Sequence, residues 1–290
     1  MTRRRGRWQR AAAAAADFVT VLTGRDAAAL RGYGVPAGRL MTLPTGCDVP
    51  GRTCWGPDPA SMRLLFIGNL HYQPNAQAAR AVTALVRDLR GCGVPARARI
   101  VGRGPAALML PEPGICWRGP VPGLDAECRG VALALAPLVS GSGMKMKMLT
   151  YLAAGLPVLA TGEAAAGLDD GHPGVVVCDD LARWPRAAAG LLASPARMAR
   201  LGEAGRAYVA RRHSWDQVAG RALDAYRRWL ALPPRARPGV PVPDGAAEPL
   251  WLAEHARQDA LGRPGLTSPQ SPFMELPALR PAGRIPGAAG

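Results

Sequence analysis

One stretch of the chain, residues 131–161, constrains the fold more than any other. An apolar run at 131–138 leads into a Gly-Ser-Gly turn, and a helix is predicted over about 144–154. A glycine and a proline end this helix, and a second apolar run at 156–161 follows at once. A strand, a turn, a helix and a second strand form a βαβ unit, whose two strands are parallel. The sequence therefore predicts an α/β fold with a Rossmann-like parallel sheet.

The turn of this βαβ unit is the strongest candidate binding site. Gly141, Ser142 and Gly143 precede the helix, and Ser142 is predicted to be its N-cap. Unpaired backbone N–H groups and the helix dipole make such a turn attractive to anions. Lys145 and Lys147 follow it, and they are the only lysines among 36 basic residues. A compact ammonium suits close approach to a phosphate, although a pair of solvated helix charges also fits this pattern.

The pattern Gly-Ser-Gly-x-Lys-x-Lys-x-Leu-x-x-Leu-Ala-Ala-Gly-Leu-Pro-Val at 141–158 resembles the donor-binding signature of GT-B glycosyltransferases of the family-4 type. In that family a glutamate binds the nucleotide ribose at the position of Thr150. A second glutamate lies against the donor sugar at the position of Ser142. Both carboxylates are missing here, whereas the turn, the lysines and the Ala-Gly-x-Pro exit are present. The resemblance implies a nucleotide-sugar site that includes Lys145, Lys147 and Thr150.

The segment before this unit reads as the opening of the same sheet. A strand at 63–68 ends in Gly68, and Asn75 is predicted to cap the helix that follows. Two further short strands end in Gly102 and Gly119. Ligands of parallel sheets bind at the carboxyl ends of strands, so these three glycines are further candidates for donor binding. A tight turn between strand and helix is the alternative for each of them, and for Gly119 the two interpretations are equally good. The family often carries a basic pair in the first loop, but no arginine or lysine occurs in this one.

Four regions are predicted along the chain. Residues 1–48 resemble the last unit of a GT-B acceptor domain and are expected to be a remnant of that domain. Residues 49–61 read as a linker, and 62–231 as the donor-binding domain with its carboxyl-terminal helices. Residues 232–290 are rich in proline and glycine without a period, which predicts a disordered tail.

Composition narrows the function classes. The net charge of +15 is compatible with nucleic acid, but the arginines are dispersed and no nucleic-acid motif occurs, so no nucleic-acid partner is expected. The six cysteines lack C-x-x-C spacing, which predicts reduced thiols rather than a metal site. No apolar stretch reaches 18 residues, so a cytoplasmic protein is expected, with peripheral contact to the inner face of a membrane as one option.

By resemblance, the predicted activity is hexosyl-type transfer from a nucleotide-sugar to an acceptor, with retention and without a metal or other cofactor. The acceptor, a sugar or a lipid-linked molecule, is not identified by the sequence, and no residue is assigned as catalytic. The alternative is a truncated, non-catalytic donor domain that binds nucleotides or a partner chain. A partner chain that supplies the acceptor domain is compatible with both.

Overall fold

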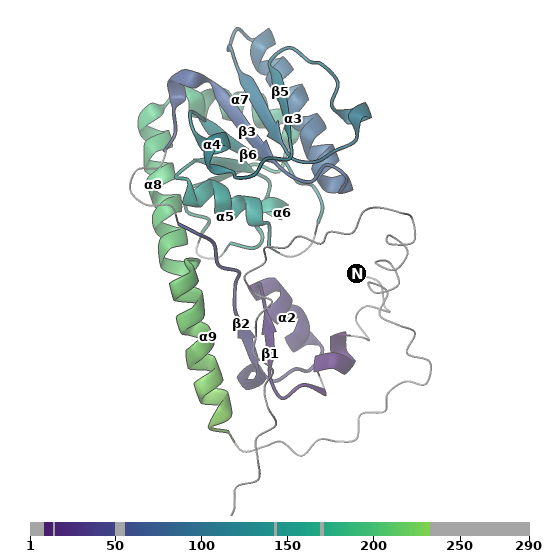
Figure 1. The fold of residues 1–290 in the computed structure, drawn as a ribbon, viewed down its shortest axis with the longest axis vertical. Helices are drawn as coiled ribbons and strands as arrows, with labels where there is room; N and C mark the ends of the chain where they lie inside the picture. Colours follow the sequence, from purple (N-terminus) through teal and green to yellow (C-terminus); the bar gives the residue numbers. More distant parts are fainter. Residues whose placement is uncertain (1–8, 14, 50–55, 142–143, 169–170, 233–290) are drawn as a thin grey trace, which may run out of the picture. The chain divides into compact units, whose positions relative to one another are not determined.

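The structure is a computed structural model that describes residues 9–13, 15–49, 56–141, 144–168 and 171–232. Its main element is a six-stranded, wholly parallel sheet in the order β5-β4-β3-β6-β7-β8 (Figure 1). The strands are β3 (Arg63–Ile67), β4 (Arg97–Val101), β5 (Ile115–Gly119), β6 (Leu133–Ala136), β7 (Val158–Ala160) and β8 (Val175–Val177). The predicted parallel sheet is confirmed. The predicted disordered tail lies outside the described residues, apart from Leu232 at its start.

Within the described residues, four α-helices lie between strands of this sheet and three follow its last strand. They are α3 (Gln73–Gly91), α4 (Asp125–Cys128), α5 (Met146–Ala153), α6 (Gly162–Ala165), α7 (Trp184–Leu192), α8 (Pro195–Arg212) and α9 (Trp215–Leu230). α7 packs against α3 and α8, and α8 packs against α5. The central strands are apolar and fully buried, because helices of a parallel sheet cover both of its faces. Within the described residues, no helix is both long and apolar enough to cross a membrane.

Strand order fixes where a ligand can bind. From β3 the chain proceeds outward through β4 to β5, whereas from β6 it proceeds in the other direction through β7 to β8. β3 and β6 therefore flank the topological switch point, where the two connections diverge. Their pairing is short, with Leu64 opposite Leu133 and Leu65 opposite Ala134. Beyond Leu65, β6 contributes no partner to β3, and a crevice at the carboxyl ends of these two strands is favoured.

A smaller parallel pair precedes this sheet. β1 (Val19–Val21) and β2 (Leu40–Thr42) pair in parallel and are connected through α2 (Gly24–Gly32). Phe18, just before β1, stacks on Trp229 of α9 with 4.5 Å between ring centroids. This contact joins the first 48 residues to the last helix.

The end of the small unit is tied to the junction of α8 and α9. The Cys47 amide donates to the carbonyl of His213 at 2.7 Å. The buried His213 ring lies 3.2 Å from the Thr45 carbonyl oxygen through Nδ1 and 3.1 Å from the Tyr208 hydroxyl through Nε2. The backbone of Gly46 packs closely against the Trp215 indole, since an added Cβ would lie 2.5 Å from that ring. The segment at 45–47 is therefore held by both backbone and side-chain contacts.

Two helix boundaries differ from the prediction. α5 begins at Met146 with Lys145 at its N-cap, so Ser142 is not the cap of this helix. α3 begins at Gln73 with Tyr72 at its N-cap, so Asn75 lies inside the helix instead of capping it. Proline is favoured in the first turn of a helix, where its missing N–H is not needed, and Pro74 there lets α3 start earlier. The side chain of Asn75 is thereby available for another contact.

Close packing of α8 on α5 depends on glycine at two positions. Gly155 ends α5 at a φ of +71°, a conformation that favours glycine. A Cβ added to Gly202 of α8 would overlap the Gly155 carbonyl oxygen. The two backbones can approach this closely only because Gly202 carries no side chain, whereas Gly155 is needed for its positive φ.

We expect Gly202→Ala to destabilise the protein by about 1–3 kcal/mol, because α8 must move away from α5 to admit the methyl group. Gly220→Ala is the matched control, since Gly220 is also helical and an added Cβ meets no atom within 4 Å. That variant should gain about 0.5–1 kcal/mol from helix propensity alone. Urea unfolding of both variants measures the difference, and equal stabilities would contradict the proposed contact.

Candidate functional site

Three of the glycines predicted as site residues meet at the carboxyl edge of the sheet. The Gly68 amide donates to Val101 at 2.9 Å, and the Gly102 amide donates to Gly119 at 2.8 Å. Gly102 has a φ of +140°, and a Cβ there would strike the Gly68 carbonyl oxygen. Close packing of β3 on β4 is thus sufficient to explain Gly102. Gly119 has open space around it, so a ligand has room to approach there.

Lys147 lies in the first turn of α5 and reaches the end of β3. Its Nζ donates a 2.7 Å hydrogen bond to Oδ1 of Asn75 and lies 4.2 Å from the centroid of the Phe66 ring. The structure thus places the lysine, a buried strand and the start of α3 around one point at the switch between β3 and β6. No carboxylate is paired with Lys147 within the described part of the chain.

The Asn75 amide is held in one orientation by its neighbours. Its Nδ2 donates to the Asn69 carbonyl at 2.9 Å, so Oδ1 faces Lys147. Gly68 leaves the space for this amide, because a Cβ at Gly68 would lie 2.9 Å from Asn75 Cγ. This is a role for Gly68 that does not involve direct ligand contact. Sequence reasoning missed the role of Asn75, since only the tertiary fold brings it to Lys147.

Tyr151 lies one helical turn after Lys147 and contacts the end of β3. Its hydroxyl accepts a 2.7 Å hydrogen bond from the Ile67 amide, which has no partner on β6. Burial raises the pKa of Tyr151, so the phenol stays protonated. A fully buried hydroxyl therefore replaces a strand-to-strand hydrogen bond at the switch point.

The environment of Lys147 weakens its hold on its proton. Burial, and to a smaller degree the positive charge of Lys145, lowers the pKa of Lys147 from its ordinary 10.5 to about 7. Desolvation disfavours an ammonium, and one amide oxygen with one aromatic ring does not replace its hydration. A bound anion would supply the missing negative charge. The site is thus suited electrostatically to a phosphate or a diphosphate.

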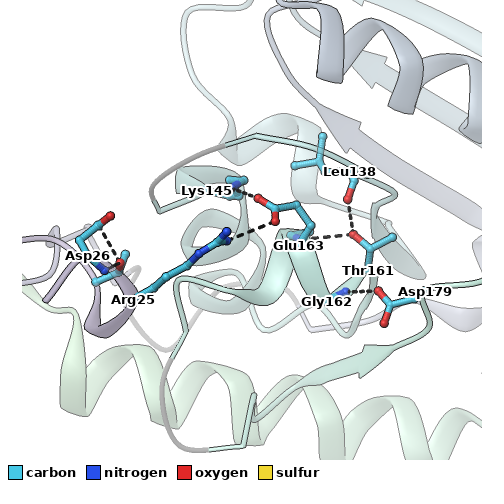
Figure 2. Close-up of polar contacts among 10 residues, drawn as sticks. Arg25, Asp26, Leu138, Lys145, Thr161, Gly162, Glu163 and Asp179 are labelled. Carbon is cyan, nitrogen blue, oxygen red and sulfur yellow. Dashed lines mark hydrogen bonds and ion pairs between the residues drawn. The ribbon is translucent and has the colours of Figure 1, made fainter. Parts of the chain in front are cut away.

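Lys145 is placed differently from Lys147. Its Nζ donates to Oε1 of Glu163 at 3.1 Å, and the second oxygen of Glu163 lies 3.4 Å from Arg25 (Figure 2). Lys145 also lies against the turn, because a Cβ added at Gly141 would be 3.4 Å from its Nζ and 3.8 Å from the Tyr72 hydroxyl. The charge of Lys145 is therefore shared with a carboxylate before any ligand arrives. Nothing in the sequence pattern identifies Glu163 as its partner.

The remaining predicted site residues are only partly placed. Ser142 and Gly143 lie outside the described residues. Thr150, at the family's ribose-binding position, is half-buried, and its hydroxyl donates to the Met146 carbonyl at 3.3 Å within the same helix. The structure brings Gly68, Lys147 and Asn75 together at one point, and Gly141 and Lys145 at another. Within the described residues, no group of three potential metal ligands occurs.

Comparison with known families finds a match for one part of the chain. Residues 61–194 match the family model described as glycosyl transferases group 1. A comparison with curated proteins found no match. The predicted fold class, a Rossmann-like parallel sheet of GT-B type, is confirmed by solved structures with the same fold.

Three of these structures are similar to this chain over most of its length. TarM of S. aureus has a TM-score of 0.62 at 13% identity, covering 77% of this chain and 46% of TarM. Sucrose-phosphate synthase from Thermosynechococcus elongatus has a TM-score of 0.61 at 18% identity, and the match covers 79% of this chain and 62% of the synthase. HepE from Anabaena, in complex with UDP and glucose, has a TM-score of 0.61 at 12% identity, and the match covers 79% of this chain and 68% of HepE. The chain thus spans about half of TarM and less than two thirds of the synthase.

We expect the low pKa of Lys147 to be visible in the stability of the protein. An unfolded chain holds this proton up to about pH 10.5 and the folded protein only to about 7, so folding stability rises with pH across that window. Lys147→Met removes the titrating group, so the wild type should gain stability relative to this variant between the two values. Lys145→Met is the control. Urea unfolding at several pH values tests this, and parallel curves for wild type and Lys147→Met would contradict it.

Proposed function

We propose that this chain, whose residues 61–194 match the family model of glycosyl transferases group 1, binds a nucleotide-sugar at the switch point and transfers its sugar to an acceptor. The observation that carries the proposal is the ammonium of Lys147. It lies at the carboxyl ends of β3 and β6, with a neutral amide and an aromatic ring as its contacts. A diphosphate is the part of a nucleotide-sugar that this charge would recognise.

The same groups would assist departure of the nucleoside diphosphate. Negative charge grows on the diphosphate as the bond to the sugar breaks, and preorganised positive charge stabilises it. Lys147 supplies that charge from a site with little water, where electrostatic interactions are stronger. Retention of configuration, a hexosyl donor and independence of metal are the finer parts of this proposal. They are supported by the motif at 141–158 alone.

A second candidate function is nucleotide binding without transfer, on its own or with a partner chain. It is favoured by threonine at the position of the family's ribose-binding glutamate, and by the use of its hydroxyl within α5. Incubation with a nucleotide-sugar and a mixed acceptor pool separates the two. Acceptor-dependent release of the nucleoside diphosphate supports transfer, whereas binding without release supports the second candidate.

We expect UDP-, GDP- or ADP-sugars to raise the melting temperature, since a ligand of the folded state alone stabilises it. Lys147→Ala should weaken binding by about 1.5–3 kcal/mol, the range for a charged hydrogen bond. Lys145→Ala should cost clearly less, because Glu163 already shares that charge. Thermal shift and calorimetry measure both effects. Absence of any shift at millimolar ligand would remove the proposal, and the reverse order of the two lysines would reassign the site.

We expect Thr150→Glu to tighten nucleotide binding, because a carboxylate accepts two strong hydrogen bonds from a ribose and a hydroxyl contributes one. Thr150→Val is the matched control. It should change affinity little, since the threonine hydroxyl is turned to the Met146 carbonyl. Calorimetric titration with UDP compares the three proteins. Weaker binding by Thr150→Glu would mean that the pocket has adapted to threonine.

A further inference from the structure

The side chain of Asn75 joins three segments at the end of β3. It lies in the first turn of α3, donates from Nδ2 to the Asn69 carbonyl at 2.9 Å, and accepts at Oδ1 from Lys147 at 2.7 Å. A Cβ on Gly68 would lie 2.9 Å from its Cγ and 3.1 Å from both Nδ2 and Oδ1, so the amide packs against the backbone there. The Asn75 oxygen is therefore presented to the lysine from a fixed position.

These two contacts require a donor and an acceptor on one short side chain. The Asn69 carbonyl oxygen can accept but not donate, and the Lys147 ammonium can donate but not accept. The amide of Asn75 satisfies both of them at once. An aspartate would supply acceptors alone, and one of its oxygens would face the Asn69 carbonyl. The local geometry thus favours an amide over a carboxylate at position 75.

The neutrality of this amide distinguishes the site from an ordinary buried ion pair. Besides the Asn75 oxygen, the Lys147 ammonium contacts the ring of Phe66, whose centroid lies 4.2 Å from Nζ. Neither β3, β6, α5, the loop at 68–72 nor the first two turns of α3 carries an aspartate or a glutamate. The elements around the ammonium therefore hold it without supplying a negative charge.

The titratable groups on these elements are positive or neutral. Lys145, at the N-cap of α5, adds a positive charge, and burial together with that charge lowers the pKa of Lys147 to about 7. Tyr151, one turn further along α5, has its pKa raised by burial and stays protonated. His71 and Tyr72 lie in the loop between β3 and α3, and both are exposed. A negative charge brought by a ligand would thus meet no competing anion on these elements.

We propose that Asn75 is a positioning residue whose amide holds the Lys147 ammonium at the carboxyl end of β3 and, being neutral, leaves its charge for the diphosphate of the donor. A carboxylate at this place would hold the lysine as well but would neutralise it. Above about pH 7 the free protein gives up the lysine proton, so binding of a diphosphate takes a proton up. This inference rests on the proposed function, because the anion is the donor's diphosphate.

The first test is UDP affinity, measured by calorimetry at about pH 7 and about pH 9. Wild-type affinity should fall about ten- to hundredfold between the two, because binding must restore the lysine proton. Asn75→Asp should bind about ten- to hundredfold more weakly at the lower pH, since its carboxylate competes with the diphosphate. Its affinity should then change less than about twofold with pH, because the ion pair keeps the lysine protonated throughout.

Gln77→Glu is the matched control for the added charge. Gln77 is exposed on the same helix, and two residues along a helix its side chain points about 200° away from that of Asn75. This variant should keep both the wild-type affinity and the wild-type fall with pH. An equal effect of Gln77→Glu and Asn75→Asp would overturn the proposal, because it would assign the loss to a general change of charge near the start of α3.

Asn75→Leu separates position from charge. Leucine is similar in size but has neither donor nor acceptor, so Lys147 loses its anchor while no new charge appears. UDP should bind about three- to tenfold more weakly, the size expected for loss of one hydrogen bond. The fall in affinity between the two pH values should remain. Equal losses in Asn75→Leu and Asn75→Asp at both pH values would overturn the proposal, because Asn75 would then serve packing alone.

A second test needs no nucleotide. Since the chain has two lysines, selective lysine labelling gives two side-chain NMR signals, assigned through Lys145→Ala and Lys147→Ala. The Lys147 signal should titrate near pH 7 in the wild type and in Gln77→Glu, and at least about one pH unit higher in Asn75→Asp. An unchanged midpoint in Asn75→Asp would overturn the proposal. If UDP failed to bind the wild type, the proposed function would fall, while these titrations would still decide whether Asn75 controls the charge of Lys147.

Discussion

The site depends on the cost of keeping one ammonium away from water. Lys147 contacts the ring of Phe66 and the amide of Asn75. Its burial, and to a smaller degree the positive charge of Lys145, lowers its pKa to about 7. An anion placed beside it would raise that pKa again, so the charge of a ligand and the proton of the lysine are coupled. Two further contacts at the switch point hold Asn75 in place beside Lys147. Asn69 orients the amide, and Gly68 leaves room for it.

The sheet determines which groups surround this lysine. β3 and β6 pair over two residues only, and the Tyr151 hydroxyl takes the Ile67 amide beyond them. Lys147 and Tyr151 are four residues apart on one face of α5, so this helix brings both a hydroxyl and a cation to the end of β3. The position of α5 in turn depends on its contact with α8, where Gly155 and Gly202 bring the two backbones together.

The sequence predicted the fold well and the site in part, for different physical reasons. Strands and helices follow from local periodicity, and the Gly-rich turn with its lysines marked the connection from strand to helix in the βαβ unit at 131–161. Helix starts were less predictable. Ser142 and Asn75 are good capping residues, yet α5 and α3 begin elsewhere. The partners of the lysines were not predictable, because Asn75 is 72 residues from Lys147 and Glu163 is 18 from Lys145. Such contacts are set by packing and not by spacing.

Lysine and arginine are not equivalent at these two positions, which explains why they stand out among 36 basic residues, 34 of them arginine. A guanidinium keeps its charge at any physiological pH and needs partners for five N–H groups. The environment of Lys147 offers one amide oxygen and a ring face, which satisfies an ammonium partly and a guanidinium poorly. Two residues along a helix, side chains point about 200° apart, so the neighbouring lysine faces a different environment. Lys145 meets a carboxylate that already has an arginine partner. The same residue type therefore occurs once as a buried ammonium among neutral groups, and once as an ammonium paired with a carboxylate that also pairs with Arg25.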